Sequence, residues 1–349
     1  MKLAIVSDLH IGKRQYRTDE NGFNRFEHIG YRALKEYTDI IVENKPDLVI
    51  NAGDIFETPN PSILAMKHYY NMQKKLENIP TMTILGNHDF AFINRKANCS
   101  AAEMAKHTYF ADYTIKSVEI NNILFVMMPY IYDKQENIMN LFRECREIAK
   151  NSTMSKKILV THGITERYHN ESLIGDPFML PDKLVTYFDL VIIGHIHTPF
   201  DYKEGDTLVL SPGSMIDYQA HVDRTGPIFL DTDTMKFEKI LVKTPHIIKL
   251  KCTEDNINQV LSNVTEDIYN ISYEGDSAII DNDIFIKAKN KAVNLIIDVI
   301  QKEDTEDVTN KPTNLNFKDW LKANYNEYVE IFNKAEGEIM NNDKTTARI

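Results

Sequence analysis

The sequence is poor in cysteine and has no long hydrophobic run. Its three cysteines, Cys99, Cys145 and Cys252, are far apart and form no C-x-x-C pair. This spacing argues against both a disulfide framework and a thiolate metal site. No apolar run reaches the length of a membrane span, and Met1-Lys2 leads into an apolar run without a signal-peptide pattern. We therefore expect a cytoplasmic protein with reduced thiols and no membrane association.

Positive charge is also scarce, because 40 Lys and Arg residues stand against 51 Asp and Glu residues, which gives a formal charge of -11. This balance argues against a broad basic surface that holds nucleic acid. A nucleic-acid substrate stays open, since some of the acidic residues could bind metal ions and a partner could contact the phosphate backbone. The 349 residues predict one large domain with a smaller one.

A cluster of polar side chains follows the apolar run over residues 81–85, which is typical of a buried strand. This cluster, Gly86-Asn87-His88-Asp89, could alone be an ordinary polar turn. The arrangement recurs after four other apolar runs, at Asp8-Leu9-His10, Gly53-Asp54, His162-Gly163 and Gly194-His195-Ile196-His197. Five strand-like runs therefore each end in Asp, Asn or His. We interpret this ordered set as a functional site at strand ends.

These motifs supply seven candidate metal ligands: Asp8, His10, Asp54, Asn87, His162, His195 and His197. Carboxylate, imidazole and amide donors without cysteine suit manganese, iron or zinc better than they suit a structural zinc site. Seven ligands exceed what one ion can use. Two ions about 3.5 to 4 Å apart, bridged by a carboxylate, are a known device for displacement at phosphorus. Asp54 is the natural bridge, as the single carboxylate at its own strand end.

The five motifs together resemble the calcineurin-like metallophosphoesterase superfamily, whose pattern is D-x-H, G-D, G-N-H-D, a lone H and G-H-x-H. The resemblance implies a four-layer αββα fold with two metal ions. It implies that Asp54 binds both ions, and it divides the other six ligands between them: Asp8, His10 and His197 for one ion, and Asn87, His162 and His195 for the other. His88 is then not a ligand. It would contact the phosphate and assist the leaving oxygen, with Asp89 orienting it, in place of a purely structural role.

Within that superfamily the sequence resembles the SbcD exonuclease family. The cues are residues 53–58 with Pro61-Ser62, residues 194–197, and Ser211-Pro212-Gly213-Ser214. Some members of that family carry His at the position where this chain has Glu57, so the balance between exonuclease and endonuclease activity stays open. The resemblance implies manganese-dependent hydrolysis of DNA phosphodiesters, as an exonuclease on duplex ends and an endonuclease on hairpins, in DNA repair and recombination.

The resemblance also implies partners. In the family an SbcC-type ATPase binds the C-terminal helices, and the chain forms a homodimer through helices that follow the second and third motifs. The dimer face here would be Ile63, Met66, Tyr69, Tyr70 and residues 72–76, although a buried core face has the same pattern. Lys13, Arg14 and Arg17 could contact DNA phosphates or could lie in a solvated loop.

The domain order also matches that family. We expect a phosphoesterase domain over residues 1–244, a small α+β capping domain over 245–301, a charged linker over 302–314 and a C-terminal helical segment over 315–349. The last segment is rich in aromatic residues such as Trp320 and Phe332, so it would fold back on its own chain or bind the ATPase.

Some elements are expected at particular residues. Helices are predicted over residues 26–43, 62–77, 98–106 and 134–150, and a β-hairpin over 113–129 turns at Asn121-Asn122. In the capping domain we predict a strand over 246–251, helices over 254–265 and 284–301, and a short strand near Ala278.

Two other functions stay open. The same metal ions could act on a phosphoprotein, a cyclic nucleotide or a nucleotide diester, although such relatives generally lack the capping domain and the helical tail. The chain could also be a scaffold without catalysis. Scaffolds on this fold usually lose a ligand or the equivalent of His88, and none is lost here.

Overall fold

The computed structural model describes residues 1–16, 18, 22–93, 96–99, 101–104, 106–131, 135–168, 179–216, 225–245 and 247–300. Arg17, the expected linker over 302–314 and the expected helical segment over 315–349 lie outside the described residues.

A first six-stranded sheet carries the three N-terminal motifs. Its strand order is β16 (Lys236–Lys239), β15 (Ile228–Asp231), β1 (Lys2–Val6), β2 (Leu48–Asn51), β3 (Thr81–Ile84) and β6 (Tyr109–Ala111). The strands β1, β2, β3 and β6 are parallel to one another. At one side of the sheet, β15 pairs antiparallel with β1, and β16 pairs antiparallel with β15. Because β1, β2 and β3 are parallel, the motifs that follow them emerge at one edge of the sheet.

A second six-stranded sheet carries the other two motifs. Its order is β13 (Phe200–Glu204), β14 (Thr207–Ser211), β12 (Leu190–Gly194), β9 (Lys156–His162), β8 (Ile123–Met128) and β7 (Lys116–Ile120). Strands β8, β9, β12 and β14 are parallel, so His162 and His195 also emerge at one edge. The predicted β7–β8 hairpin is confirmed, and it turns at Asn121 and Asn122, both with positive φ.

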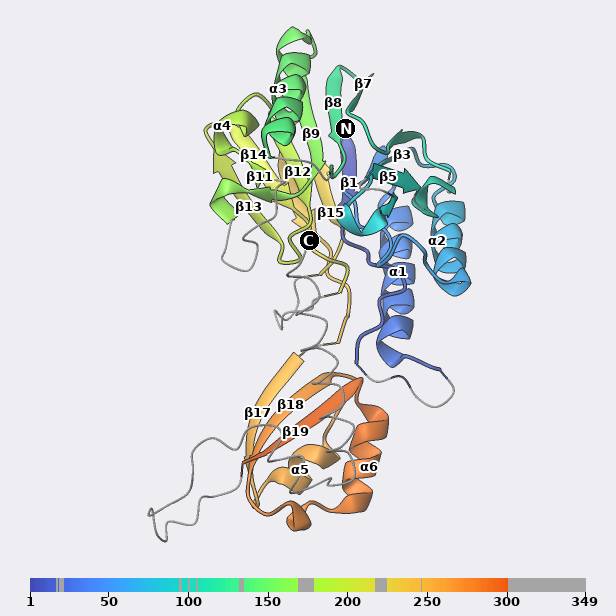
Figure 1. Ribbon diagram of the computed structural model, residues 1–349, viewed down its shortest axis with the longest axis vertical. Helices are drawn as coiled ribbons and strands as arrows, with labels where there is room; N and C mark the ends of the chain where they lie inside the picture. The colour runs from blue at the N-terminus through green and yellow to red at the C-terminus, as the bar shows by residue number, and fades with distance from the viewer. Residues whose placement is uncertain are drawn as a thin grey trace, which may run out of the picture. The chain divides into compact units, whose positions relative to one another are not determined.

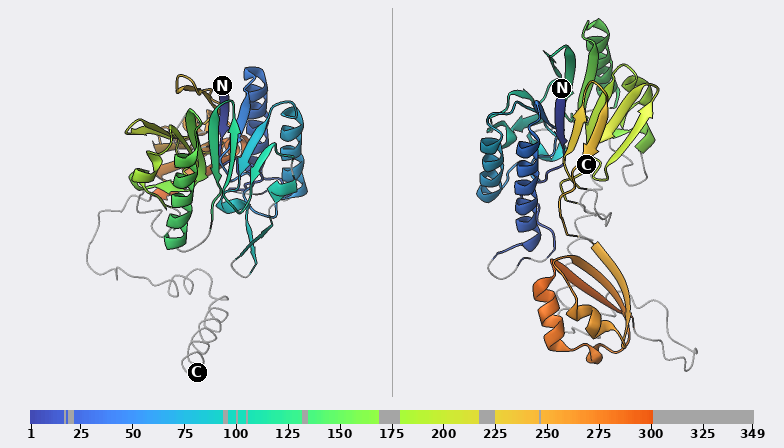
Figure 2. Two further views of the ribbon diagram at one scale, coloured as in Figure 1. Left: turned by 90° about the horizontal axis from the view of Figure 1, so that it is seen from above. Right: turned by 180° about the vertical axis from the view of Figure 1, so that it is seen from behind.

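The two sheets pack face to face through alternate residues of their strands. Leu3, Ile5 and Ile50 of the first sheet lie in one core cluster with Phe125, Val160 and Ile192 of the second. The intervening residues face the helices on the outside, as in a sheet with both faces covered. Figure 1 shows α1 (Arg25–Asn44) and α2 (Ile63–Lys75) on one side, and α3 (Gln135–Asn151) and α4 (Asp182–Val185) on the other. Seen from above, the sheets lie between these helices (Figure 2), which confirms the αββα sandwich.

Two of the helices, α1 and α2, begin after a side-chain cap. Asn24 caps α1, since its side chain accepts from the N–H of Glu27, and Ser62 caps α2 through the N–H of Ala65. The helix expected over 98–106 is wrong, because residues 96–99 form β5 (Lys96–Cys99), paired with β4 (Ala91–Ile93), and only a 3-10 turn follows at Ala101–Met104. No helix in the described part of the chain is long and apolar enough to cross a membrane.

Residues 247–300 form a parallel three-stranded sheet with its own core of buried residues (Figure 1). The strands are β17 (Ile247–Thr253), β18 (Ile268–Glu274) and β19 (Asn294–Ile300), with α5 (Ile257–Ser262) and α6 (Asn282–Lys291) between them. The helix expected over 284–301 is wrong. It ends at Lys291, and the β-branched residues that follow pair with β18. The strand expected near Ala278 is also wrong, because the Asp276 side chain caps a 3-10 turn there.

Candidate dinuclear metal site

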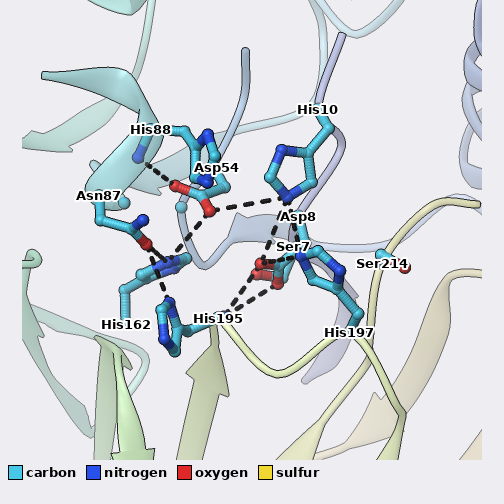
Figure 3. A network of polar contacts seen from close by, with 12 residues as sticks. Ser7, Asp8, His10, Asp54, Asn87, His88, His162, His195, His197 and Ser214 are labelled. Carbon is cyan, nitrogen blue, oxygen red and sulfur yellow. Dashed lines mark hydrogen bonds and ion pairs between the residues drawn. The ribbon is translucent and has the colours of Figure 1, made fainter. Parts of the chain in front are cut away.

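The loops after β1 and β2 are held together by their backbones. Asp8 N–H donates to Gly53 O at 2.9 Å, and His10 N–H donates to Asp54 O at 3.0 Å. Asp8, His10 and Asp54 all have positive φ, which is uncommon outside glycine. Residues held in this conformation cluster at functional sites, where the surrounding structure fixes them. The three side chains are buried and point into one space between the sheets (Figure 3).

The first group of candidate ligands is Asp8, His10 and His197. His10 Nε2 lies 3.0 Å from His197 Nε2, and Asp8 Oδ1 lies 4.0 Å from each of these two nitrogens. These ligand atoms lie close enough together to hold one ion. The His197 side chain is 26% exposed while those of Asp8 and His10 are fully covered, so the group opens to solvent on the His197 side.

The second group contains Asn87, His162 and His195. Asn87 Oδ1 lies 3.1 Å from His162 Nε2 and 2.9 Å from His195 Nδ1. His195 follows β12, and Asn87 lies in the 3-10 turn Asn87–Asp89 after β3, so the two sheets both contribute. With Asp54, the two histidines form another cluster that could hold a metal ion.

Asp54 lies between the two groups. Its Oδ2 is 3.4 Å from Nε2 of His162 and 3.7 Å from Nε2 of His10 (Figure 3). Its other oxygen, Oδ1, accepts the backbone N–H of His88 at 2.8 Å, which fixes the rotation of the carboxylate. One oxygen therefore faces both ligand groups, as in a carboxylate that bridges two ions through a single oxygen.

The orientation of His162 is set by a backbone carbonyl. Its Nδ1 lies 2.7 Å from Ala52 O, and a carbonyl can only accept, so Nδ1 carries the proton. Such a bond to the distal nitrogen is the usual way in which proteins orient a metal-binding histidine. Nε2 then faces the oxygens of Asp54 and Asn87. Nε2 and the two oxygens converge on one place, where either a proton on Nε2 or a metal cation satisfies them.

The pKa values of the site also indicate a place for a cation beside His162. Burial lowers the pKa of His162, but the carboxylates of Asp54 and Asp8 raise it more, to about 9. Burial raises the pKa of Asp54, but the neighbouring histidines hold it well below its usual range. Burial lowers the pKa of His197 to about 4 against the pull of Asp8, so this histidine is neutral and its lone pair is available. A proton on His162 occupies the place that a metal cation would take.

Glycine at position 86 is required by close packing. A Cβ on Gly86 would lie 2.2 Å from Asp54 Oδ1 and 2.7 Å from Cε1 of His162. Real Cβ atoms essentially never approach so closely. The glycine of the Gly86-Asn87-His88-Asp89 motif therefore allows the turn after β3 to contact both the carboxylate of Asp54 and a histidine of the other sheet.

The side chains of His88 and Asp89 make different kinds of contact. His88 is half-buried, and its Nδ1 donates to the backbone carbonyl of Glu57 at 2.9 Å, which leaves Nε2 for other contacts. Asp89 does not orient His88 directly as expected. Its carboxylate accepts the backbone N–H groups of Ile55, Phe56 and Gly86 at 2.9 to 3.2 Å. Asp89 thus fixes the loop after β2 against the turn after β3.

The basic loop residues are paired in the described chain. Lys13 Nζ lies 3.0 Å from Glu57 Oε1, and Arg14 Nε lies 2.9 Å from the buried carboxylate of Glu27. The Arg14 side chain remains 55% exposed, so this pair still leaves Arg14 open to solvent. Their contact with DNA stays a prediction.

Two residues near the site, Tyr130 and Glu57, have no role predicted from the sequence. Tyr130 is buried, its ring lies 6.3 Å from that of His195, and its N–H donates to Leu85 O. It follows β8 after one proline, but the pattern of Asp, Asn or His at strand ends does not include tyrosine and so does not find it. Glu57 contacts His10, with 2.8 Å between Oε2 and Nδ1. Only the folded loop shows that contact.

The sandwich and its clustered Asp, His and Asn side chains define a metallophosphoesterase. Residues 1–199 match the sequence profile described as calcineurin-like phosphoesterase, and the chain belongs to this family. The family uses divalent metal ions, and the Asp and His clusters described above could bind them.

The chain is also similar to individual proteins. The chain is 27% identical over 313 residues to the DNA double-strand break repair protein Mre11 of Methanococcus maripaludis, a match covering 81% of this chain and 78% of that protein. It is 26% identical over 245 residues to the SbcD component of the nuclease SbcCD of Staphylococcus epidermidis, covering 62% of each. The solved structure of TT1561 from Thermus thermophilus matches 69% of this chain and 99% of its own, at 13% identity and a TM-score of 0.44.

Proposed function

We propose that this protein is a metal-dependent DNA nuclease of the SbcD and Mre11 type, acting on duplex ends and on hairpins in DNA repair and recombination. The observation that carries the proposal is the position of Asp54 Oδ2, which faces His10 on one side and His162 on the other. The names of the two relatives supply the substrate class.

The residues divide into two ion sites. Asp8, His10 and His197 bind one manganese ion, Asn87, His162 and His195 bind the other, and Asp54 bridges them. The ions, when bound, supply positive charge for the developing charge on the phosphate and lower the pKa of water. This assignment predicts that each of the seven side chains is needed for hydrolysis.

In this proposal His88 transfers a proton to the leaving oxygen beside the ions. Its Nδ1–H is engaged by the Glu57 carbonyl, so Nε2 is the atom that faces a phosphate or a leaving oxygen. Protonation of the leaving oxygen by a positioned histidine typically contributes a rate factor of about 10² to 10⁴. Asp89 acts through the backbone, because it holds the turn that carries His88.

DNA contacts outside the metal site are proposed at Lys13, Arg14 and Arg17. Replacing all three with Ala should weaken DNA binding and reduce its salt dependence, because each phosphate contact releases counterions. Unchanged binding would contradict this part of the proposal.

Two protein partners belong to the proposal. The first is a second copy of this chain, docking at α2, where Ile63 is 82% exposed and Tyr70 is 66% exposed. Tyr69 and Met72, which were expected on the same face, are instead buried in the core. The second partner is an SbcC-type ATPase, bound through residues 315–349, and it would supply the positive surface that this acidic chain lacks.

The test is release of nucleotides from end-labelled linear duplex DNA by the purified chain with Mn²⁺, with His88→Ala as the control. Release that is lost in the variant supports the nuclease and the role of His88 together. No release, with continued cleavage of bis-nitrophenyl phosphate, would instead favour a small diester as the substrate. Truncation after residue 244 would then leave activity nearly intact.

A further inference from the structure

Glu57 contacts two histidines of the site with two different groups. Its carboxylate Oε2 lies 2.8 Å from Nδ1 of His10, and its backbone carbonyl accepts from Nδ1 of His88 at 2.9 Å. The rings of His10 and His88 lie edge to face, with centroids 4.8 Å apart. One residue therefore touches a predicted metal ligand and the predicted proton donor.

The contact with His10 fixes which nitrogen of that ring faces the ions. A carboxylate accepts hydrogen bonds, so the proton lies on Nδ1 and the lone pair on Nε2. Nε2 is the atom that lies near Asp54 and His197. Glu57 thus orients His10 as the carbonyl of Ala52 orients His162.

Lys13 also contacts the carboxylate of Glu57. Its Nζ lies 3.0 Å from Oε1 and 3.2 Å from Oε2 of Glu57, and the Glu57 side chain is only 24% exposed. The lysine holds the carboxylate ionised and limits its rotation. Lys13 thus supports the Glu57 carboxylate in addition to the DNA contact proposed for it above.

His10, Glu57 and His88 could also hold an ion among themselves. Such an ion would use Nδ1 of His10, while the site described above uses Nε2 of the same ring. One imidazole would then have to bind two cations and lose both of its protons. The Glu57 carboxylate lies 2.8 Å from Nδ1 as an ion-pair partner, which favours the orienting role.

We propose that Glu57 is a positioning residue, whose carboxylate holds His10 in the tautomer that binds metal and whose carbonyl holds His88 in the same orientation. The inference rests on the proposed dinuclear site and goes beyond it, because it assigns the control of ion affinity to a residue that is not a ligand. Loss of such a contact typically weakens metal affinity about 10- to 100-fold.

The test measures the affinity of the full chain for Mn²⁺ by calorimetry, without any substrate. Glu57→Ala should bind Mn²⁺ about 10- to 100-fold more weakly than the unchanged chain. Glu57→Gln keeps an acceptor for the Nδ1 proton, and its affinity should stay within a few-fold of the unchanged chain. Glu147→Ala is the matched control, since Glu147 also pairs with basic side chains but lies on α3, outside the site.

Hydrolysis of bis-nitrophenyl phosphate gives the second readout. At saturating Mn²⁺, Glu57→Ala should regain most of its kcat, because added metal compensates for the weaker affinity. Should Glu57→Ala fail to fold, Glu57→Asp replaces it, because its carboxylate is one methylene too short to reach His10 and should also bind Mn²⁺ more weakly.

Two results would overturn the inference. Glu57→Ala binding Mn²⁺ like the unchanged chain would show that His10 needs no orienting carboxylate. Glu57→Gln binding as weakly as Glu57→Ala would show that a Glu57 oxygen is itself a ligand. Both results are independent of whether DNA is the substrate, since no substrate is present.

Discussion

The backbone N–H of His195 donates to both carboxylate oxygens of Asp8, at 3.0 Å each, although 187 positions separate them in the sequence. Asp8 follows β1 of the first sheet, and His195 follows β12 of the second. The backbone of Met215 also donates to the carbonyl of Asp8, at 3.1 Å. The candidate site is therefore built across the two sheets and depends on how they pack.

Metal ions should stabilise the fold. An ion that binds only the folded chain adds about 2.7 kcal/mol to the free energy of unfolding at a concentration 100 times its Kd. We expect a higher Tm with Mn²⁺ in a thermal denaturation scan, and no increase for Asp54→Asn, which lacks the bridging charge. An equal increase in Asp54→Asn would show that the ions bind elsewhere.

His88→Ala should separate substrates by their leaving groups. A nitrophenolate leaves without protonation, so kcat on bis-nitrophenyl phosphate should fall only a few-fold, through lost contact with the phosphate. A sugar oxygen needs a proton, and cleavage of DNA should fall about 10²- to 10⁴-fold. Initial rates on both substrates at saturating Mn²⁺ measure this, and an equal loss on the two would contradict the role of His88 as a proton donor.

Replacement by alanine should change the free energy of unfolding in opposite directions at Gly86 and Gly30. Gly86→Ala places a Cβ against Asp54 and His162, so we expect lower stability and loss of Mn²⁺ binding. Gly30→Ala lies within α1, where the nearest atom would be Ile216 Cδ1 at 3.6 Å. Alanine there should raise the free energy of unfolding by about 0.5 to 1 kcal/mol. Denaturant titration of both variants measures these changes. A Gly86→Ala variant as stable as the unchanged chain would contradict the close packing.

The αββα sandwich was expected from the resemblance of the five motifs to a known family, and the strands themselves were predicted because they are short apolar runs that end in polar motifs. Asp8, Asp54, Asn87 and His162 were found this way, since parallel strands place their carboxyl ends together. The helix expected over 284–301 was wrong because Ile296, Ile297 and Val299 suit a helix face as well as a strand, and only pairing with β18 decides between them.

The contacts of Asp89 and Glu57 could not be predicted for a different reason. Asp89 adjoins His88 in the sequence, yet its carboxylate binds N–H groups 33 and 34 positions earlier. Glu57 reaches His10 only because the loops after β1 and β2 run side by side. Such contacts depend on tertiary structure and leave no local pattern.

Uptake of Mn²⁺ should release protons. The pKa of His162 is about 9, so this ring is protonated at pH 7 when no metal is bound. Metal binding needs the neutral ring, and apparent affinity should therefore rise as the pH increases from 7 toward 9. Calorimetry at pH 7 in buffers of different ionisation enthalpy should show about one proton released from His162. A buffer-independent enthalpy would contradict this expectation.

The central claim is that two ions bind on either side of Asp54. Anomalous scattering from crystals grown with Mn²⁺ tests it most directly. We predict two peaks about 3.5 to 4 Å apart that share Asp54 Oδ2, one next to His10 and the other next to His162. A single peak, or an ion held between His10, Glu57 and His88, would contradict the account.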